Sequence, residues 1–419
     1  MNNTHSMSGR DKQLLILVLG ILTCLGPLAI DLYLPAMPAI AESMNEPLGS
    51  IQLTLSAYTL GFALGQLIFG PLADRFGRLR VMVPGLVFYI ATTLLSAFTN
   101  TANELIVARI LQAMSGAAVM VTIPAMVRDM FDRDDCARIM SSILLVMTVA
   151  PLIAPLLGGQ LLLLGGWRSL FITLALFGCA ALVLALFMLK ESLPEEHRQA
   201  LTAKQLAKNY LSVITHRNAM GCILGHGFFF GGLFAFISAS PFVYIQLYGI
   251  APEYYGFLFA ANIVAMGICN IINMRLIGRF PLLNMLRCGT AFAAFSGLVL
   301  LFMAVTGAGG LLGIVIPVVL FVGMLGFTGP NSNALALSYF PGIAGTANAA
   351  AGILRFGIGG ITAGLAGVFH NGTAVPMAAL IAGCGLCSVL SVTLVKDRQV
   401  ASRTPINDEH HDEPPRAAA

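Results

Sequence analysis

Three ionisable side chains lie inside long apolar stretches of the sequence, where a charge is hardest to accommodate. Asp31 stands in LGPLAIDLYLPAMP, Arg109 in LIVARILQAMSG and Arg355 in GILRFGIGG. An ionised carboxylate is costly in hydrocarbon, so Asp31 can hold a proton near neutral pH and is a candidate proton carrier. The alternative is that Asp31 faces water at the outer end of its stretch.

Asp31 and Arg109 each lie about five residues from the outer end of their stretches, or roughly 7–8 Å along a helix. They can be partners if the two stretches are neighbours, unless the flexible Arg109 side chain extends to the interface instead. Arg355 lies deeper, and the sequence offers no intramembrane carboxylate in its half of the chain. A helix C-terminus or a substrate oxygen is its candidate partner.

The elements that position these residues are predicted to be membrane-spanning helices. Hydrophobic residues make up 57 % of the 419 residues and charged residues only 10 %. Soluble domains of this length keep more charges on their surface, and the net charge of +4 is spread over loops, which argues against a nucleic-acid partner. Twelve apolar stretches of spanning length occur, near residues 14–36, 51–72, 81–99, 104–127, 139–164, 168–190, 219–245, 254–275, 285–306, 311–334, 344–369 and 375–395.

A polar segment divides these stretches into two sets of six, the pattern of a parallel repeat. We therefore expect an all-α membrane protein with an N-terminal six-helix bundle (1–190), a cytoplasmic linker (191–217), a C-terminal six-helix bundle (218–396) and a disordered cytoplasmic tail (397–419). The linker's second half is amphipathic and is expected on the membrane surface. Both termini are predicted to be cytoplasmic, because 20 of the 23 Lys and Arg residues then face the cytoplasm.

The segment Gly70–Arg80, GPLADRFGRLR, joins the second and third stretches. Asp74 among Arg75, Arg78 and Arg80 indicates an ion-pair lock at a helix junction; the alternative is a basic turn that only sets topology. The spacing G-x-L-A-D-R-x-G-R resembles the signature of the major facilitator superfamily between its second and third helices. This resemblance implies a transporter fold with twelve helices.

Two further motifs extend the resemblance. Arg109 with Gln112 is similar to the fourth-helix motif of proton-coupled members, although Ala113 stands where that motif usually has glycine. The segment 150–159, APLIAPLLGG, resembles the fifth-helix motif of antiporters, with Ala154 replacing a glycine. The residues of this expected gating helix are Pro151, Pro155, Gly158 and Gly159.

The segments AIDLYLPAMP, LSAYTLGFALGQLIFGPLADRFGR, GTANAAAGILRFGIGG and SPFVY together resemble the bicyclomycin and chloramphenicol/florfenicol resistance (Bcr/CflA-type) transporters, over about residues 10–395. These are drug:proton antiporters of the bacterial inner membrane. In that family the Asp74 equivalent faces the start of the eleventh helix, here near Ala344, and the Arg78 equivalent pairs with an acid of the fourth helix, here Asp129. These residues, with Arg75, are expected to form a conformational latch.

The fold also implies a central cavity lined by helices from both halves. Polar and aromatic residues of these helices are the candidates for substrate binding, although each can equally be a packing residue: Tyr33, Tyr58, Gln112, His226, Phe230, Tyr244, Asn262, Asn331, Asn333 and Arg355. A break of the tenth helix is expected at Gly329-Pro330, where freed carbonyls can face the cavity. A lining that combines polar and aromatic side chains with few fixed charges suits neutral or lipophilic molecules.

The expected function is proton-coupled export of small, mainly neutral antibacterial compounds, as a monomer without a cofactor beyond the proton gradient. The alternatives are a proton-coupled importer or exporter of a specific metabolite on the same fold, and a membrane sensor, which the lack of an appended signalling domain disfavours. No hydrolase or phosphate-binding motif indicates an enzyme, and Cys384-x-x-Cys387 has no partner pair that would indicate a metal site.

Overall fold

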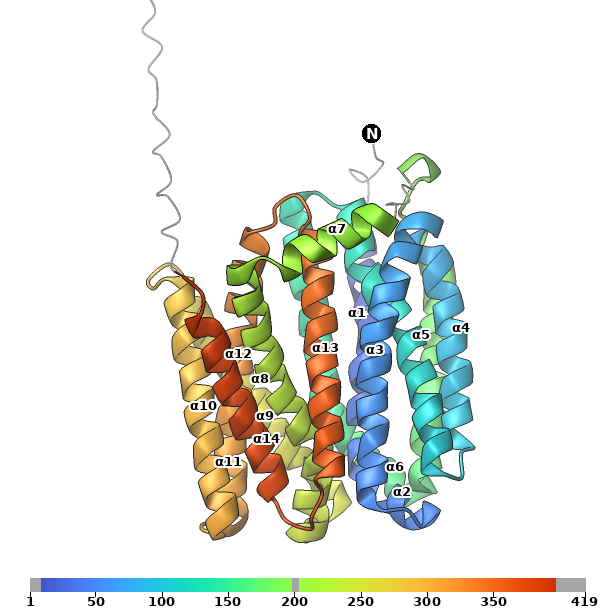
Figure 1. Ribbon diagram of the computed structural model, residues 1–419. Helices are drawn as coiled ribbons and strands as arrows, with labels where there is room; N and C mark the ends of the chain where they lie inside the picture. The colour runs from blue at the N-terminus through green and yellow to red at the C-terminus, as the bar shows by residue number, and fades with distance from the viewer. Residues whose placement is uncertain (1–8, 198–202, 397–419) are drawn as a thin grey trace, which may run out of the picture.

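The computed structural model describes residues 9–197 and 203–396, which are almost entirely helical (Figure 1). The predicted tail, 397–419, lies outside the described residues. The helices of the first half are α1 (Gly9–Asp31), η2 (Leu34–Ala36), α2 (Met37–Met44), α3 (Leu48–Phe76), α4 (Arg78–Ala97), α5 (Ala102–Met130) and α6 (Arg133–Met188). The following segment carries η3 (Glu195–His197) and α7 (Ala203–Ile214). The helices of the second half are α8 (Arg217–Pro241), the π-helical η4 (Phe242–Leu247), α9 (Pro252–Leu276), α10 (Leu282–Thr306), α11 (Gly310–Gly323), α12 (Leu325–Ser338), α13 (Ala344–Val368) and α14 (Val375–Thr393).

Eleven helical stretches of the described residues are long and apolar enough to cross a membrane. One of them, Arg138–Met188, has 51 residues, which corresponds to about 77 Å of helix against a hydrocarbon core of about 30 Å. Gly166 interrupts it with a φ of 69°, a left-handed conformation that glycine adopts without steric cost. The helix α6 therefore crosses twice, and the prediction of twelve crossings in an all-α membrane protein is confirmed.

The side chains are distributed as a lipid-facing protein requires. Phe98, Leu164 and Phe187 are 72 %, 85 % and 85 % exposed on the outside of the bundle, whereas Arg109 and Gln112 are completely buried. Lipid tails are as apolar as leucine, so large apolar side chains can remain on the surface while polar groups find partners inside.

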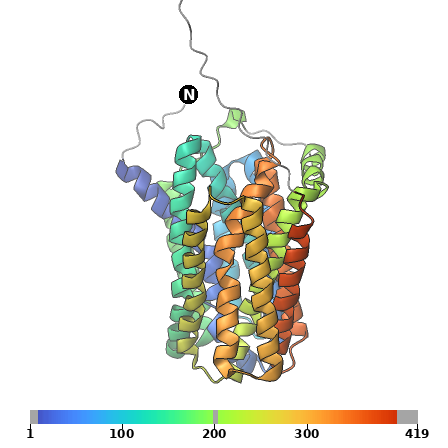
Figure 2. The same ribbon diagram turned by 90° about the vertical axis from the view of Figure 1, so that its left-hand side faces the viewer.

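The two six-helix bundles stand side by side, with α3 and α13 adjacent between them (Figure 1). Figure 2 turns the second bundle, yellow to red, toward the viewer and shows its long helices running in nearly the same direction. The short helix α7 lies across one end of the molecule, crosswise to the long helices (Figure 1). We call this the α7 end.

The bundles are tightly closed at the end opposite α7. A Cβ added to Gly49 of α3 would lie 2.6 Å from the Gly367 oxygen of α13, and one added to Gly159 of α6 would lie 2.7 Å from the Pro252 oxygen of α9. At the α7 end, by contrast, a Cβ on Gly345, in the first turn of α13, would meet nothing within 4 Å. The structure is therefore closed at one end and looser at the other.

The expected break of the tenth helix is displaced. The interruption lies at Met324, between α11 and α12, and Pro330 stands inside α12 rather than at the break. A proline removes the hydrogen bond to the carbonyl four residues earlier and clashes with it, so its effect falls near Gly326, one turn before the ring. The prediction of a break at Gly329-Pro330 was wrong by about one turn.

Candidate functional site

Arg109 is the organising residue of the first bundle. Its Nη1 donates to Gln112 Oε1 at 2.7 Å, and its Nη2 donates to the Ala29 carbonyl of α1 at 2.9 Å. Gln112 Nε2 in turn donates to Thr93 Oγ1 of α4 at 2.7 Å. The planar guanidinium fork can make such divergent bonds at fixed angles. One buried cation thus ties α1, α4 and α5 together, and it does not extend to the membrane interface.

Two tyrosine rings surround the same guanidinium. Its carbon lies 4.3 Å from the ring centre of Tyr58 and 4.9 Å from that of Tyr33. A hydrogen bond of 2.7 Å joins Tyr33 Oη to Thr54 Oγ1, whereas Tyr58 Oη is buried without a partner. The cation is therefore stabilised by aromatic faces, an arrangement that gains strength when it is shielded from water.

Asp31, the last residue of α1, is not the ion-pair partner of Arg109. Asp31 is 5 % exposed, and among the described residues no cation lies within ion-pair distance of its carboxylate. The expected pairing is absent because Arg109 has both terminal nitrogens engaged with Gln112 and Ala29.

Asp31 instead interacts electrostatically with Tyr58 of α3 and with Tyr255 of α9. Tyr58 also lies under the Arg109 guanidinium, so the same tyrosine interacts with both the buried acid and the buried base. The carboxylate therefore lies where the first bundle meets the second.

A second aromatic cluster faces this acid from the other bundle. Tyr255 Oη and Ser240 Oγ are joined by a hydrogen bond of 2.8 Å, and the ring of Tyr255 is 6.1 Å from that of Tyr244. Tyr244 Oη and Asn262 Oδ1 are buried without partners. Tyr255 was not among the predicted site residues, because a tyrosine near a helix N-terminus reads as an interfacial anchor.

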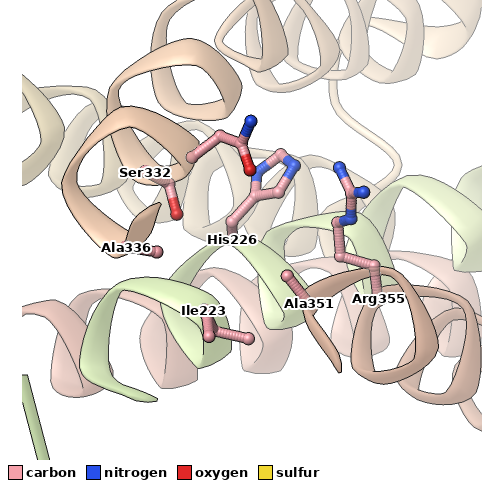
Figure 3. A pocket seen from close by; sticks show the side chains of 7 residues that line it. Ile223, His226, Ser332, Ala336, Ala351 and Arg355 are labelled. Atoms are coloured by element: carbon pink, nitrogen blue, oxygen red, sulfur yellow. The ribbon is translucent and has the colours of Figure 1, made fainter. Parts of the chain in front are cut away.

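A third cluster surrounds a small pocket between α8, α12 and α13, with room for about one water molecule. His226, Asn333 and Arg355 line it, together with Ser332. Figure 3 shows the His226 imidazole and the Arg355 guanidinium rising to the same side of the pocket. His226 Nδ1 and Arg355 Nε are both buried without partners.

Other predicted cavity residues contact neighbouring side chains in this structure. Asn331 Nδ2 donates to Asn273 Oδ1 of α9 at 2.8 Å and to the Phe327 carbonyl at 2.8 Å, away from the pocket. Phe230 packs edge-on against Phe356, with 5.3 Å between their ring centres. The ring centre of Phe356 also lies 4.6 Å from that of Phe62 in α3, so these rings link the two bundles.

The predicted latch residues gather at the junction of α3 and α4, at the α7 end. Arg78 Nε donates to Asp129 Oδ2 of α5 at 3.0 Å, and Arg78 also pairs with Asp74 one turn before it. Ser192 Oγ donates to the same Asp129 oxygen at 3.1 Å. Arg75 is exposed, and its guanidinium lies 5.2 Å from the Phe76 ring. Arg78 is therefore the centre of the group and Arg75 its edge.

Glu191 completes this group and was missed in the sequence. Its carboxylate accepts from the N–H groups of Arg78, Leu79 and Arg80 at 2.8, 3.1 and 3.4 Å. The first N–H groups of a helix lack internal partners, and a carboxylate there also meets the positive end of the helix dipole. Gly77, with a φ of 109°, leaves space where a side chain would meet Glu191.

The contact between Asp74 and the start of α13 that the resemblance implies is not formed by a hydrogen bond in this structure. Among the described residues Asp74 makes no hydrogen bond to that helix and pairs with Arg78 instead. It also lies near α7: burial raises the pKa of Tyr210, and the negative charge of Asp74 adds to this rise.

The predicted gating residues lie where α6 contacts both bundles. A Cβ on Gly158 would meet the Leu32 carbonyl and, at 3.0 Å, Pro35 Cγ. A Cβ on Gly159 would lie 2.7 Å from the Pro252 oxygen and 2.8 Å from Glu253 Cα. Pro155 and Pro151 fall one and two turns earlier, respectively, inside the same helix. The two glycines permit the close approach that shuts the end opposite α7.

Known proteins are similar to this chain in sequence and in architecture. The family described as the Major Facilitator Superfamily matches residues 19–364. The chain is 34 % identical to the bicyclomycin resistance protein homolog of Haemophilus influenzae, over 93 % of this chain and 97 % of that protein. It is 29 % identical to a chloramphenicol resistance protein of Pseudomonas aeruginosa, over 84 % of this chain and 82 % of that protein.

Among solved structures, a D-xylose-proton symporter superposes with a TM-score of 0.72 at 16 % identity, over 91 % of this chain and 97 % of that one. At this identity the similarity concerns the fold alone. The sequence matches and the twelve crossings agree with the resemblance first seen in Gly70–Arg80. The chain belongs to the major facilitator superfamily and, within it, to the Bcr/CflA-type drug transporters.

Proposed function

We propose that the chain is a drug:proton antiporter that exports small, mainly neutral or lipophilic antibacterial compounds across the bacterial inner membrane. The names of its relatives, a bicyclomycin resistance protein homolog and a chloramphenicol resistance protein, support drug export. The distribution of Lys and Arg supports a cytoplasmic location of the α7 end and of both termini. The structure then corresponds to a state closed toward the periplasm, and the working unit is a monomer.

The position of Asp31 carries the proposal of proton coupling. A carboxylate that is 5 % exposed, has no ion pair and interacts with tyrosines of both bundles is costly when ionised. The charge of Asp31 therefore affects the free energy of closing the two bundles against each other. Protonation removes the cost of closing the bundles around it, and deprotonation restores that cost.

Arg109 is the group that can pair with the ionised Asp31 in another state of the transport cycle. In the present state its Nη1 and Nη2 are engaged by Gln112 and Ala29 and its Nε has no partner, which leaves Asp31 without a counter-ion. In the state that releases the proton, Arg109 turns toward Asp31 past the ring of Tyr58, whose hydroxyl has no partner here. Proton entry from the periplasm then favours the return to the state closed on that side, and substrate from the cytoplasm favours proton release.

The latch at the α7 end stabilises the opposite state, in which the α7 end is closed. Helix α13 begins at Ala344 without a side-chain cap, so its first N–H groups attract a carboxylate. Asp74 is half exposed and bonded only through Arg78 here. When the α7 end closes, Asp74 docks onto this helix start while Arg78 stays with Asp129. Residues 1–190 and 218–396 are the two bundles that move.

Transport by the purified protein in proteoliposomes tests this proposal. Vesicles with an imposed proton gradient should accumulate chloramphenicol or bicyclomycin in the direction opposite to proton flow, and an uncoupler should abolish the accumulation. Accumulation in the direction of proton flow would identify a symporter, and accumulation that survives the uncoupler would exclude proton coupling. Both results would contradict the proposal.

A further inference from the structure

The pocket between α8, α12 and α13 holds a positive charge that the protein does not neutralise. Glu253 is the single carboxylate in the sequence between residues 203 and 396, and it lies at the start of α9, at the opposite end of the molecule. Among the described residues, no acidic side chain lies within 4 Å of Arg355. Arg355 is partly exposed, but its Nε is buried, so a ligand that supplies a counter-ion is favoured at this site.

Two polar atoms of this pocket have no hydrogen-bond partner, whereas Ser332 Oγ donates to the Cys222 carbonyl at 2.7 Å. His226 is 6 % exposed, and its Nδ1 is buried without a hydrogen bond, like Arg355 Nε. Both residues line the pocket (Figure 3), and Asn333 lines it as well. Buried polar groups are normally satisfied, so two unsatisfied groups at one pocket indicate a ligand that forms hydrogen bonds with them.

Aromatic rings adjoin these polar groups. The ring centres of His226 and Phe230 are 6.2 Å apart, and Phe230 packs against Phe234 at 5.0 Å and Phe356 at 5.3 Å. The ring of Phe356 reaches Phe62 of the first bundle at 4.6 Å. Because the pocket has room for about one water molecule, only the polar head of a ligand can enter it beside Arg355, and an apolar body would lie outside the pocket against these rings.

The depth of the pocket excludes a lipid headgroup as the natural occupant. Arg355 is eleven residues from the first residue of α13, or about 16 Å along the helix, which is half of a hydrocarbon core of about 30 Å. A headgroup phosphate stays at the interface. The occupant must come from the transport path.

We propose that this pocket binds the oxyanion of an amphiphilic substrate, a carboxylate or sulfonate carried on an aromatic or otherwise lipophilic body. The planar fork of Arg355 matches the two oxygens of such a group, and His226 and Asn333 can donate to its remaining lone pairs. This assignment rests on the proposed transport function, and it adds lipophilic acids to the mainly neutral compounds.

Binding to the purified protein in an uncharged detergent tests the proposal without requiring transport. The probes are naphthoate and naphthamide, which share one aromatic body and differ in the charge of the head. Wild type should bind naphthoate about tenfold or more tightly than naphthamide, as a charge-assisted bidentate pair provides. Calorimetry gives both affinities.

The variants are Arg355→Gln, which removes the charge, Arg355→Lys, which keeps the charge without the fork, and Arg279→Gln as a control in the exposed turn between α9 and α10. We expect the ratio of the two affinities to fall to about one in the first variant, to be intermediate in the second and to stay at the wild-type value in the third. Measurable naphthamide binding shows that each variant is folded.

A wild-type ratio near one, or a ratio that persists in Arg355→Gln, would overturn the assignment. The failure of the proposed export would appear differently. In that case proteoliposomes would accumulate no drug against a proton gradient, while the ratio of the two affinities would still depend on Arg355.

Discussion

The contact between Gly159 of α6 and the start of α9 gives a direct test of how the molecule closes. We consider the variant Gly159→Ala, which adds one methyl group at this contact. The new Cβ would lie 2.7 Å from the Pro252 oxygen and 2.8 Å from Glu253 Cα. Both atoms belong to the backbone, so no side chain can turn aside to make room. Closure at this end therefore becomes strained, and opening relieves the strain.

The size of the effect follows from the cost of overpacking. An extra methyl group in a tight contact costs about 1–3 kcal/mol, which corresponds to a shift of roughly 5–150-fold between two states. Alanine also favours a helix over glycine by about 0.5–1 kcal/mol, but it does so in both states, since α6 is helical in each. That term cancels from the equilibrium between them.

Double electron–electron resonance measures this shift. Spin labels on genetically encoded amino acids at Ser43 of α2 and Ala308 of the α10–α11 turn, both exposed, report the distance across the end opposite α7. Gly159→Ala should move most of the population to longer distances. The control is Gly267→Ala in α9, where an added Cβ meets nothing within 4 Å. A distance distribution of Gly159→Ala that matches both wild type and this control would refute the reasoning.

Three other substitutions probe the ion pairs and caps. Asp74→Asn should reduce efflux while the amount of inserted protein stays the same, because a latch worth about 1–3 kcal/mol acts on one equilibrium; wild-type efflux would leave the charge with a topological role only. Arg109→Lys should lower the unfolding temperature and stop transport, since lysine cannot bond Gln112 and Ala29 with a planar fork; a fully active lysine variant would remove the geometric argument. Glu191→Ala leaves the start of α4 uncapped and should cost about 0.5–2 kcal/mol, visible as a lower unfolding temperature, whereas an unchanged temperature would show that water replaces the cap.

Much of the fold could be predicted because hydrocarbon imposes strict demands on the sequence. Each crossing needs about 20 apolar residues, so the twelve stretches are visible without a structure. The turn at Gly166 is so short that α6 continues through it by hydrogen bonding, and only the φ of 69° reveals the reversal. The position of the break in the tenth helix was missed because a proline acts on the turn before it.

The candidate site was harder to predict, because depth along a helix does not fix the direction of a side chain. Asp31 and Arg109 were expected at matching depths, but the Arg109 fork turns to Gln112 and to the Ala29 carbonyl instead. A sequence pattern does not show which backbone carbonyls and nearby amides compete with Asp31 for the Arg109 guanidinium. Glu191 was missed because it is more than a hundred residues from the N–H groups that it caps, and no local motif connects them.

The central claim is that Asp31 carries the transported proton, and the variant Asp31→Asn tests it most directly. Asparagine keeps the shape of the protonated acid and cannot release a proton, so substrate can still bind while the coupled cycle stops. The control is Glu42→Gln in α2, an exposed acid of the same region. In proteoliposomes with an imposed proton gradient, we predict that wild type and Glu42→Gln accumulate chloramphenicol against its gradient and that Asp31→Asn only equilibrates it. Accumulation by Asp31→Asn at the wild-type level would contradict the account and would place the proton on another group.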